Sequence, residues 1–167
     1  MKKQNMILRY SLLVLMGLAL TLPYSCTKRL GALSERSNGI TKRIINTAFA
    51  PKAIGPYSQA VEINGMLFIS GQVPVDPVTD KIVGGGITEQ TGQVMKNIGA
   101  ILKAAGYEYS DVVKSTCLMS DLDNFKAMND VYGKYYPTDP PARATFAVVK
   151  LPLEALIEIE TIAVRSR

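Results

Sequence analysis

A single hairpin signal does most to restrict the fold of this chain. Asn64 and Gly65 stand between the apolar-rich residues of 61–63 and 66–72. An Asn-Gly pair in this setting favours a two-residue type I′ turn, because both turn positions need a positive φ that these residues tolerate. The stretch therefore predicts two antiparallel strands, and with them a sheet that is at least partly antiparallel.

Two helices are predicted from the spacing of apolar residues further along the chain. The first covers about 88–105, is capped by Thr88 and Glu89, and stops at Gly106. The second covers about 121–135, where aromatic and methionine side chains recur at helical spacing. Each helix therefore carries one apolar stripe that a sheet or another helix must cover.

The remaining strand signals complete an α+β architecture. Further strands are expected at 43–46, 112–119, 142–148 and 155–164. Their order around the two helices predicts a mostly antiparallel sheet with both helices on one face. The other face would be apolar and uncovered, and this predicts that oligomer partners bury it.

The first 26 residues differ from the rest of the chain. Basic residues precede an apolar run at 11–22, and Cys26 ends the segment. This run is shorter than the roughly 20 residues that a spanning helix needs, so it indicates an export signal. Cys26 resembles the cleavage and acylation site of bacterial lipoproteins. We expect lipid tethering to a bacterial membrane, facing the periplasm or exterior, with secretion into the periplasm or an uncleaved anchor as alternatives.

The chain after this leader has the size of one domain with one core. Residues 27–41 mix charge, Ser and Gly without periodicity and predict a flexible tether, so the folded domain is expected to span 42–167. The formal net charge is +5, but part of the basic excess lies in the leader, and the domain gives no reason to expect a nucleic-acid partner. Cys117, in a strand-like apolar run, predicts a buried structural thiol.

The chain contains no histidine, which narrows the possible chemistry. Ser-His-Asp and Cys-His catalysis, and zinc sites built on histidine, are excluded. An arginine, glutamates, tyrosine, serine and backbone groups remain. This set is suited to holding a small carboxylate and placing a water near a polarised carbon.

Arg143 lies in the predicted strand 142–148, and its charge needs a partner. Strand alternation puts Arg143 and Thr145 on the face opposite Phe146, which we expect to be buried. If this strand forms a hairpin with 155–164, Glu160 lies across from Arg143 and Glu158 across from Thr145. Two interpretations stay open: a ligand site, or a surface ion pair that contributes little to stability.

Four blocks of the sequence carry a resemblance to a known family. They are 54–59 (IGPYSQ), 68–74 (FISGQVP), 141–143 (PAR) and 157–163 (IEIETIA). These blocks resemble, in the same order, the signatures of the RidA/YjgF family of reactive-intermediate deaminases. The resemblance implies a chorismate-mutase-like homotrimer with active sites in the clefts between subunits. It also implies hydrolysis of small enamine and imine acids, such as 2-aminoacrylate and 2-iminopropanoate, to 2-oxo acids and ammonia without a metal or cofactor.

The resemblance assigns roles to the residues with the strongest chemical character. Arg143 is similar to the arginine that holds the substrate carboxylate, with Ser70 and the Gly71 backbone nearby. Glu158 stands at the position of the glutamate that orients or activates the attacking water. These roles make Arg143 and Glu158 the candidate catalytic residues.

Three more residues match cleft positions of the family. Tyr57 and Asn129 resemble residues that line the cleft. Thr145 stands where some members have cysteine, which implies an altered substrate preference with activity retained. The predicted export signal is a second departure, because typical members are cytosolic.

Two other classes of protein remain as alternatives. A non-catalytic binding module for small carboxylates or partner proteins would keep Arg143 and make Glu158 dispensable. A chorismate-mutase-type enzyme would share the fold but would need more cationic contacts than this single arginine supplies. The identity of the physiological imine is left open by the sequence.

Overall fold

A computed structural model describes residues 41–165 of the chain. The predicted leader 1–26, its cysteine Cys26 and all but the last residue of the predicted tether 27–41 lie outside the described residues. Between residues 41 and 165, no helix is both long and apolar enough to cross a membrane.

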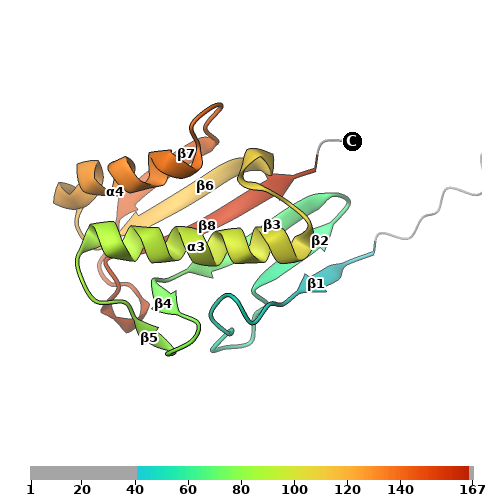
Figure 1. Cartoon of the computed structure of the whole chain (residues 1–167), viewed down its shortest axis with the longest axis horizontal. Coiled ribbons are helices and arrows are strands. Elements are labelled where there is room, and N and C mark those ends of the chain that lie inside the picture. Colours follow the sequence, from blue (N-terminus) through green and yellow to red (C-terminus); the bar gives the residue numbers. More distant parts are fainter. Residues whose placement is uncertain (1–40, 166–167) are drawn as a thin grey trace, which may run out of the picture. The chain divides into compact units, whose positions relative to one another are not determined.

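A six-stranded sheet forms the centre of the fold (Figure 1). Its strands, in spatial order, are β1 (Arg43–Ile45), β2 (Ala60–Ile63), β3 (Met66–Gln72), β8 (Ile157–Val164), β6 (Val112–Met119) and β7 (Ala142–Ala147). All neighbouring strands are antiparallel except β6 and β7, which are parallel. Two short strands, β4 (Val75–Asp76) and β5 (Lys81–Ile82), pair with each other beside this sheet.

The predicted hairpin is present between β2 and β3. Ile63 pairs with Met66, so Asn64 and Gly65 alone make the turn. Both have positive φ, 52° and 76°, as a type I′ turn requires. The hairpin prediction is therefore confirmed in its strands, its register and its turn.

Two α-helices follow the predicted order. Helix α3 (Ile87–Ala105) ends at Gly106, whose φ of 82° is left-handed, and this confirms the predicted stop. At the start of α3, Gly86 is the N-cap, and its N–H donates to Glu89 Oε2 at 2.8 Å. The predicted capping role of Glu89 is therefore confirmed, and the predicted capping role of Thr88 is wrong.

The second predicted helix is divided into three pieces. Helix α4 (Phe125–Tyr132) lies between two 3-10 turns, η2 (Leu122–Asn124) and η3 (Gly133–Tyr135). Two more 3-10 turns, η1 (Tyr109–Asp111) and η4 (Pro152–Glu154), precede β6 and β8 respectively.

Both helices cover the same face of the sheet, as predicted (Figure 1). The core between these layers contains Leu67 from β3, Ile159 from β8 and Met95 from α3, all fully buried. Cys117 of β6 is buried here as a free thiol, which confirms its structural reading. Burial raises the pKa of the Cys117 thiol to about 11, against the opposing effects of the Arg143 guanidinium and the Thr145 hydroxyl.

The opposite sheet face is uncovered within the chain and carries exposed apolar side chains. Phe68 pairs with Ile162, and Phe146 pairs with Leu118, so these side chains form apolar neighbours on that face. Phe146 is 54% exposed. The prediction that Phe146 and Arg143 lie on opposite faces of the strand is confirmed. The prediction that the face of Phe146 is buried within the chain is wrong, because the helices cover the face on which Arg143 lies.

The predicted hairpin between 142–148 and 155–164 is wrong. Strand β6 lies between β7 and β8: its Ser115 pairs with Arg143 on one side and with Thr161 on the other. Arg143 is therefore not across from Glu160, and Thr145 is not across from Glu158. The physical reason is the connection through α4, which returns β7 parallel to β6 on one edge and leaves the other edge of β6 to β8.

Candidate active site

Glu158 marks the first of two groups of candidate site residues. It lies on the uncovered sheet face, since its neighbours Ile157 and Ile159 point into the core. Its side chain borders a cavity of about 350 Å³, here called the glutamate cavity. Tyr57, Ser70 and Gly71, all predicted site residues, line the same cavity, together with Ile54, Val73 and Pro152.

A β-bulge in β3 places Gly71 next to the Glu158 side chain. The pairing between β3 and β8 shifts register between Ile69 and Gln72, where one extra residue is accommodated in β3. A Cβ placed on Gly71 would come within 2.8 Å of Glu158 Cδ and closer still to Oε1. Glycine at position 71 therefore leaves the space that the Glu158 carboxyl group occupies, and a side chain there would displace this group.

The environment of Glu158 favours the protonated form of its side chain. Burial raises the pKa of this carboxyl group, and the nearby charge of Glu160 raises it further. A carboxyl group with a raised pKa binds and releases protons closer to neutral pH, as a general acid–base group must.

The loop that carries Tyr57 is fixed by a buried amide. Gln59 donates from Nε2 to the Pro51 carbonyl at 2.8 Å and accepts from the Thr47 N–H at 2.7 Å. The Tyr57 hydroxyl accepts from the Ile54 N–H at 3.3 Å, while its ring stays half-exposed. The loop therefore presents the ring of Tyr57 at the mouth of the glutamate cavity.

Ser70 connects this loop to β3. Its hydroxyl donates to the Ser58 carbonyl at 2.7 Å, and its backbone N–H donates to the Gln59 carbonyl at 3.0 Å. The hydroxyl proton is engaged in this bond, so Ser70 has only acceptor capacity left for a ligand.

Arg143 marks the second group, on the helix-covered side of the edge strand β7. Its guanidinium carbon lies 4.7 Å from the ring centroid of Tyr132 and 5.7 Å from that of Phe125, both on α4. Within residues 41–165 this guanidinium makes no hydrogen bond and no ion pair. Its donors are therefore free to bind a planar anion such as a carboxylate.

Asn129 and Thr145 accompany Arg143. Asn129 lies on the same face of α4 as Phe125 and Tyr132, since it is four residues after one and three before the other. Thr145 is on the same face of β7 as Arg143 and pairs with Cys117. These three residues, Arg143, Asn129 and Thr145, are here called the arginine group.

The glutamate cavity and the arginine group do not face each other in one chain. Glu158 lies on the uncovered sheet face, Arg143 lies on the helix-covered side, and β6 separates their strands. The single chain thus brings together four of the seven predicted domain residues at one place and three at another.

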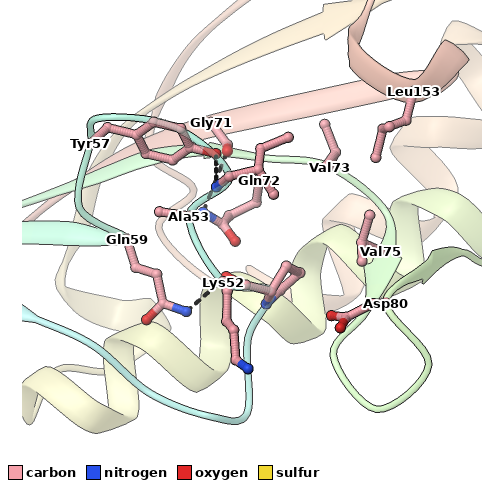
Figure 2. A pocket seen from close by; sticks show the side chains of 12 residues that line it. Lys52, Ala53, Tyr57, Gln59, Gly71, Gln72, Val73, Val75, Asp80 and Leu153 are labelled. Atoms are coloured by element: carbon pink, nitrogen blue, oxygen red, sulfur yellow. Dashed lines mark hydrogen bonds between the residues drawn. The ribbon is translucent and has the colours of Figure 1, made fainter.

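A further cavity, of about 420 Å³, was missed by sequence reasoning (Figure 2). Its walls come from segments far apart in the sequence, including Lys52, Val75, Asp80 and Leu153. No local sequence pattern could have grouped them, because only the folded loops bring them together. Among residues 41–165, there is no cluster of three or more His, Cys, Asp or Glu side chains that could hold a metal ion.

The fold and these residues define a class of protein. The family described as Endoribonuclease L-PSP matches residues 47–165, and the chain belongs to this family, in which the RidA/YjgF proteins stand. The resemblance seen in the four sequence blocks is thereby confirmed.

Known members are similar over nearly the whole domain. Reactive Intermediate Deaminase A of Arabidopsis thaliana chloroplasts is 48% identical over 132 residues, covering 79% of this chain and 71% of the relative. A 2-iminobutanoate/2-iminopropanoate deaminase of Capra hircus is 48% identical over 128 residues, covering 77% of this chain and 93% of the relative. The crystal structure of the Rid-family protein YyfA of Yersinia pestis matches with a TM-score of 0.73 at 46% identity, covering 75% of this chain and 100% of that structure.

Proposed function

We propose that this protein is a hydrolytic deaminase of reactive enamine and imine acids, with 2-aminoacrylate and 2-iminopropanoate as its simplest substrates. The observation that carries the proposal is the half-buried Glu158 carboxyl group with a raised pKa, seated on Gly71 at the wall of a cavity. Two relatives, each 48% identical over the domain, support the same activity: one is named 2-iminobutanoate/2-iminopropanoate deaminase and the other Reactive Intermediate Deaminase A.

The proposed chemistry needs one water and one proton carrier. The Glu158 carboxylate accepts a proton from water as the water oxygen bonds to C2 of the imine. This proton then passes from Glu158 to the nitrogen, which gives a carbinolamine with an amino group and a hydroxyl group on C2. Glu158 next carries the hydroxyl proton to the amino group, and the C2–N bond breaks as the C2=O bond forms and ammonia leaves. The products are a 2-oxo acid and ammonia, and Glu158 returns to its carboxylate form.

Arg143 is proposed to hold the substrate carboxylate. Two parallel N–H donors of the guanidinium match the two oxygens of a carboxylate. The rings of Tyr132 and Phe125 hold the guanidinium from α4 and leave its donors unused. Binding through a charged pair of this kind fixes the position of C2 relative to the attacking water.

We further propose a homotrimer in which the arginine group of one subunit completes the glutamate cavity of the next. Two features support it: the uncovered face carries exposed apolar side chains such as Phe68 and Phe146, and Arg143 and Glu158 do not meet in one chain. Burial of the apolar face would supply the association energy.

Export and lipid anchoring at Cys26 are also proposed, on the basis of the leader sequence alone. Replacement Cys26→Ala should release the protein from the membrane fraction or stall its processing. Replacement Cys117→Ala, at the second cysteine, should leave fractionation unchanged. Membrane association that survives Cys26→Ala would refute acylation at this residue.

RNA cleavage, which the family description names, receives no support from the site. The chain has no histidine to act as acid or base. The charge of Glu160, which lies close enough to raise the pKa of Glu158, would repel a phosphate near the glutamate cavity. An imine acid, whose carboxylate is held by Arg143 at the other end, fits this charge distribution better.

The test is the rate of ammonia and pyruvate release from 2-aminoacrylate that a serine-eliminating enzyme generates in the same vessel. The proposal predicts a rate well above the spontaneous hydrolysis, and a near-spontaneous rate with Glu158→Gln. Binding of small carboxylates without any acceleration would instead favour the binding module, and consumption of chorismate would favour a mutase.

A further inference from the structure

The cavity missed by sequence reasoning adjoins the glutamate cavity, and it is here called the side cavity. It has a volume of about 420 Å³, which lies within the range of small-molecule sites. Four residues line both cavities: Ile54, Tyr57, Gly71 and Val73. A ligand group next to Gly71 and Glu158 can therefore extend from one cavity into the other.

Apolar side chains form one wall of the side cavity (Figure 2). Val73 and Val75 come from the segment after β3, and Leu153 comes from η4. In Figure 2 the Leu153 side chain extends from this 3-10 turn toward the side of the cavity where Val73 and Val75 lie. Lys52 and Asp80 add polar groups to the lining, and the Asp80 carboxylate lies beside Val75 (Figure 2). Leu153 and Val73 therefore supply the apolar contact at the other end of this wall.

Leu153 has an unfavourable backbone conformation and an exposed apolar side chain. Its backbone is left-handed, with φ 56° and ψ 22°, and its side chain is 57% exposed. A leucine in this conformation carries a backbone penalty and leaves apolar surface in water. Asp80, with φ 55°, lines the same cavity, so two of the five non-glycine residues with positive φ in the part of the chain that the structure describes gather here. Strained residues collect at ligand sites, where binding compensates for their cost.

We propose that the side cavity binds the apolar side chain of the imino acid substrate, and that Leu153 is a specificity-determining residue of this subsite. This inference rests on the proposed deaminase function. Carbon C2 of the substrate carries three groups: the carboxylate is held by Arg143, and the nitrogen and the incoming water are served by Glu158. The third group, the side chain, is left to the adjoining apolar space.

The proposal predicts a preference for imines with larger apolar side chains. Each methylene moved from water into apolar surroundings contributes about fourfold to binding. The imine of leucine carries three more carbons than 2-iminopropanoate, so we expect kcat/KM for it to be higher by about tenfold or more. An amino acid oxidase with catalase generates both imines in solution from leucine and alanine.

The decisive experiment compares Leu153→Gly with Glu154→Gly on these two imines. Both replacements place glycine at a left-handed position, with φ 56° in each case, but only Leu153 lines the side cavity. Both should keep a Tm at or above that of the unaltered protein. The ratio of kcat/KM for the leucine imine to that for 2-iminopropanoate should fall about fivefold to tenfold in Leu153→Gly and stay unchanged in Glu154→Gly. Leu153→Met, which keeps an apolar side chain, should retain most of the ratio.

Each outcome separates this inference from the function on which it rests. Turnover of 2-iminopropanoate with a ratio near one in the unaltered protein overturns the inference alone. An equal ratio in Leu153→Gly and Glu154→Gly also overturns the inference alone. A change of oligomeric state in Leu153→Gly overturns it too, because Leu153 would then belong to a contact between subunits. Failure to accelerate hydrolysis of either imine overturns the proposed function and this inference with it.

Discussion

The carboxyl group of Glu158 occupies the space that a side chain at Gly71 would fill. The two residues lie on neighbouring strands, β8 and β3, at the place where the register between these strands shifts. The bulge, Gly71 and Glu158 therefore act together. The bulge shifts the backbone of β3, and Gly71 leaves room for the Glu158 carboxyl group. This carboxyl group is half-buried as a result, and burial raises its pKa.

Replacement Gly71→Ala tests this arrangement. The added Cβ would come within 2.8 Å of Glu158 Cδ, but it meets only the end of a flexible side chain, so we expect the fold to survive. The carboxyl group must move by about an ångström, and a displacement of this size can cost on the order of 100-fold in rate. Deaminase assays and thermal unfolding of this variant check both parts. Full activity in Gly71→Ala would show that the Glu158 position is not critical.

Glu158→Gln should lower kcat and leave KM little changed, because a water-activating carboxylate acts in the transition state. In the unaltered protein, kcat/KM should fall as pH drops through the raised pKa of Glu158, since only the carboxylate accepts a proton. The matched variant Glu160→Gln removes the repelling charge, so this acid limb should move to lower pH. Unchanged kcat in Glu158→Gln would transfer water activation to Glu160 or to backbone groups.

Stability measurements give an independent control for the same glutamate. The pKa of the Glu158 carboxyl group is higher in the folded than in the unfolded protein. Its protonation therefore contributes fully to stability at pH values below the unfolded-state pKa, and this contribution is lost as the pH rises through the folded-state pKa. Glu158→Gln removes that loss, so its Tm at pH 7 should equal or exceed that of the unaltered protein. The advantage should shrink near pH 4. A lower Tm at pH 7 would mean that the charged form of Glu158 stabilises the fold.

Arg143→Lys should not be conservative. A lysine ammonium is a point charge and lacks the planar pair of donors. Hydrogen bonds to charged groups contribute roughly 1.5 to 3 kcal/mol, which corresponds to about a 10-fold to 150-fold loss in kcat/KM. Arg143→Ala should lose at least as much, while both variants stay folded. Arg165, whose guanidinium lies 4.6 Å from the Tyr107 ring centroid, gives a matched control: Arg165→Lys should keep activity. Activity retained in Arg143→Ala would remove the arginine from substrate binding.

The uncovered sheet face should be the subunit interface. Phe146→Asp places a charge on this face beside Leu118, and a buried unpaired charge costs several kcal/mol, so the trimer should dissociate. Val78→Asp, at an exposed position in the β4–β5 turn, should leave the trimer intact. Light scattering at micromolar concentration measures both. A stable monomer of the unaltered domain would contradict the trimer and any cleft between subunits.

Local patterns in the sequence predicted the local structure well. The Asn64–Gly65 turn, the Gly106 stop of α3 and the burial of Cys117 each depend on neighbours along the chain, and each is confirmed. The one-sided placement of the helices is confirmed as well, since apolar stripes at helical spacing report which surface each helix must cover.

Strand neighbours could not be predicted in the same way. A short connection between the last two strands suggested a hairpin, but β6 offers two free edges and takes β7 on one and β8 on the other. Side-chain alternation does not encode which edge a strand will join. The same limitation explains the side cavity: Val75 and Leu153 are distant in sequence and meet only after the sheet has formed.

The central claim is that each active site combines Glu158 of one subunit with Arg143 of another. The direct test mixes the inactive variants Arg143→Ala and Glu158→Gln, unfolds and refolds them together, and measures imine hydrolysis. In a cyclic trimer with random assembly at equal amounts, about one quarter of the sites would receive an intact glutamate and an intact arginine. Activity should therefore return to about one quarter of that of the unaltered protein. Refolded mixed trimers that remain as inactive as either variant alone would contradict a site shared between subunits.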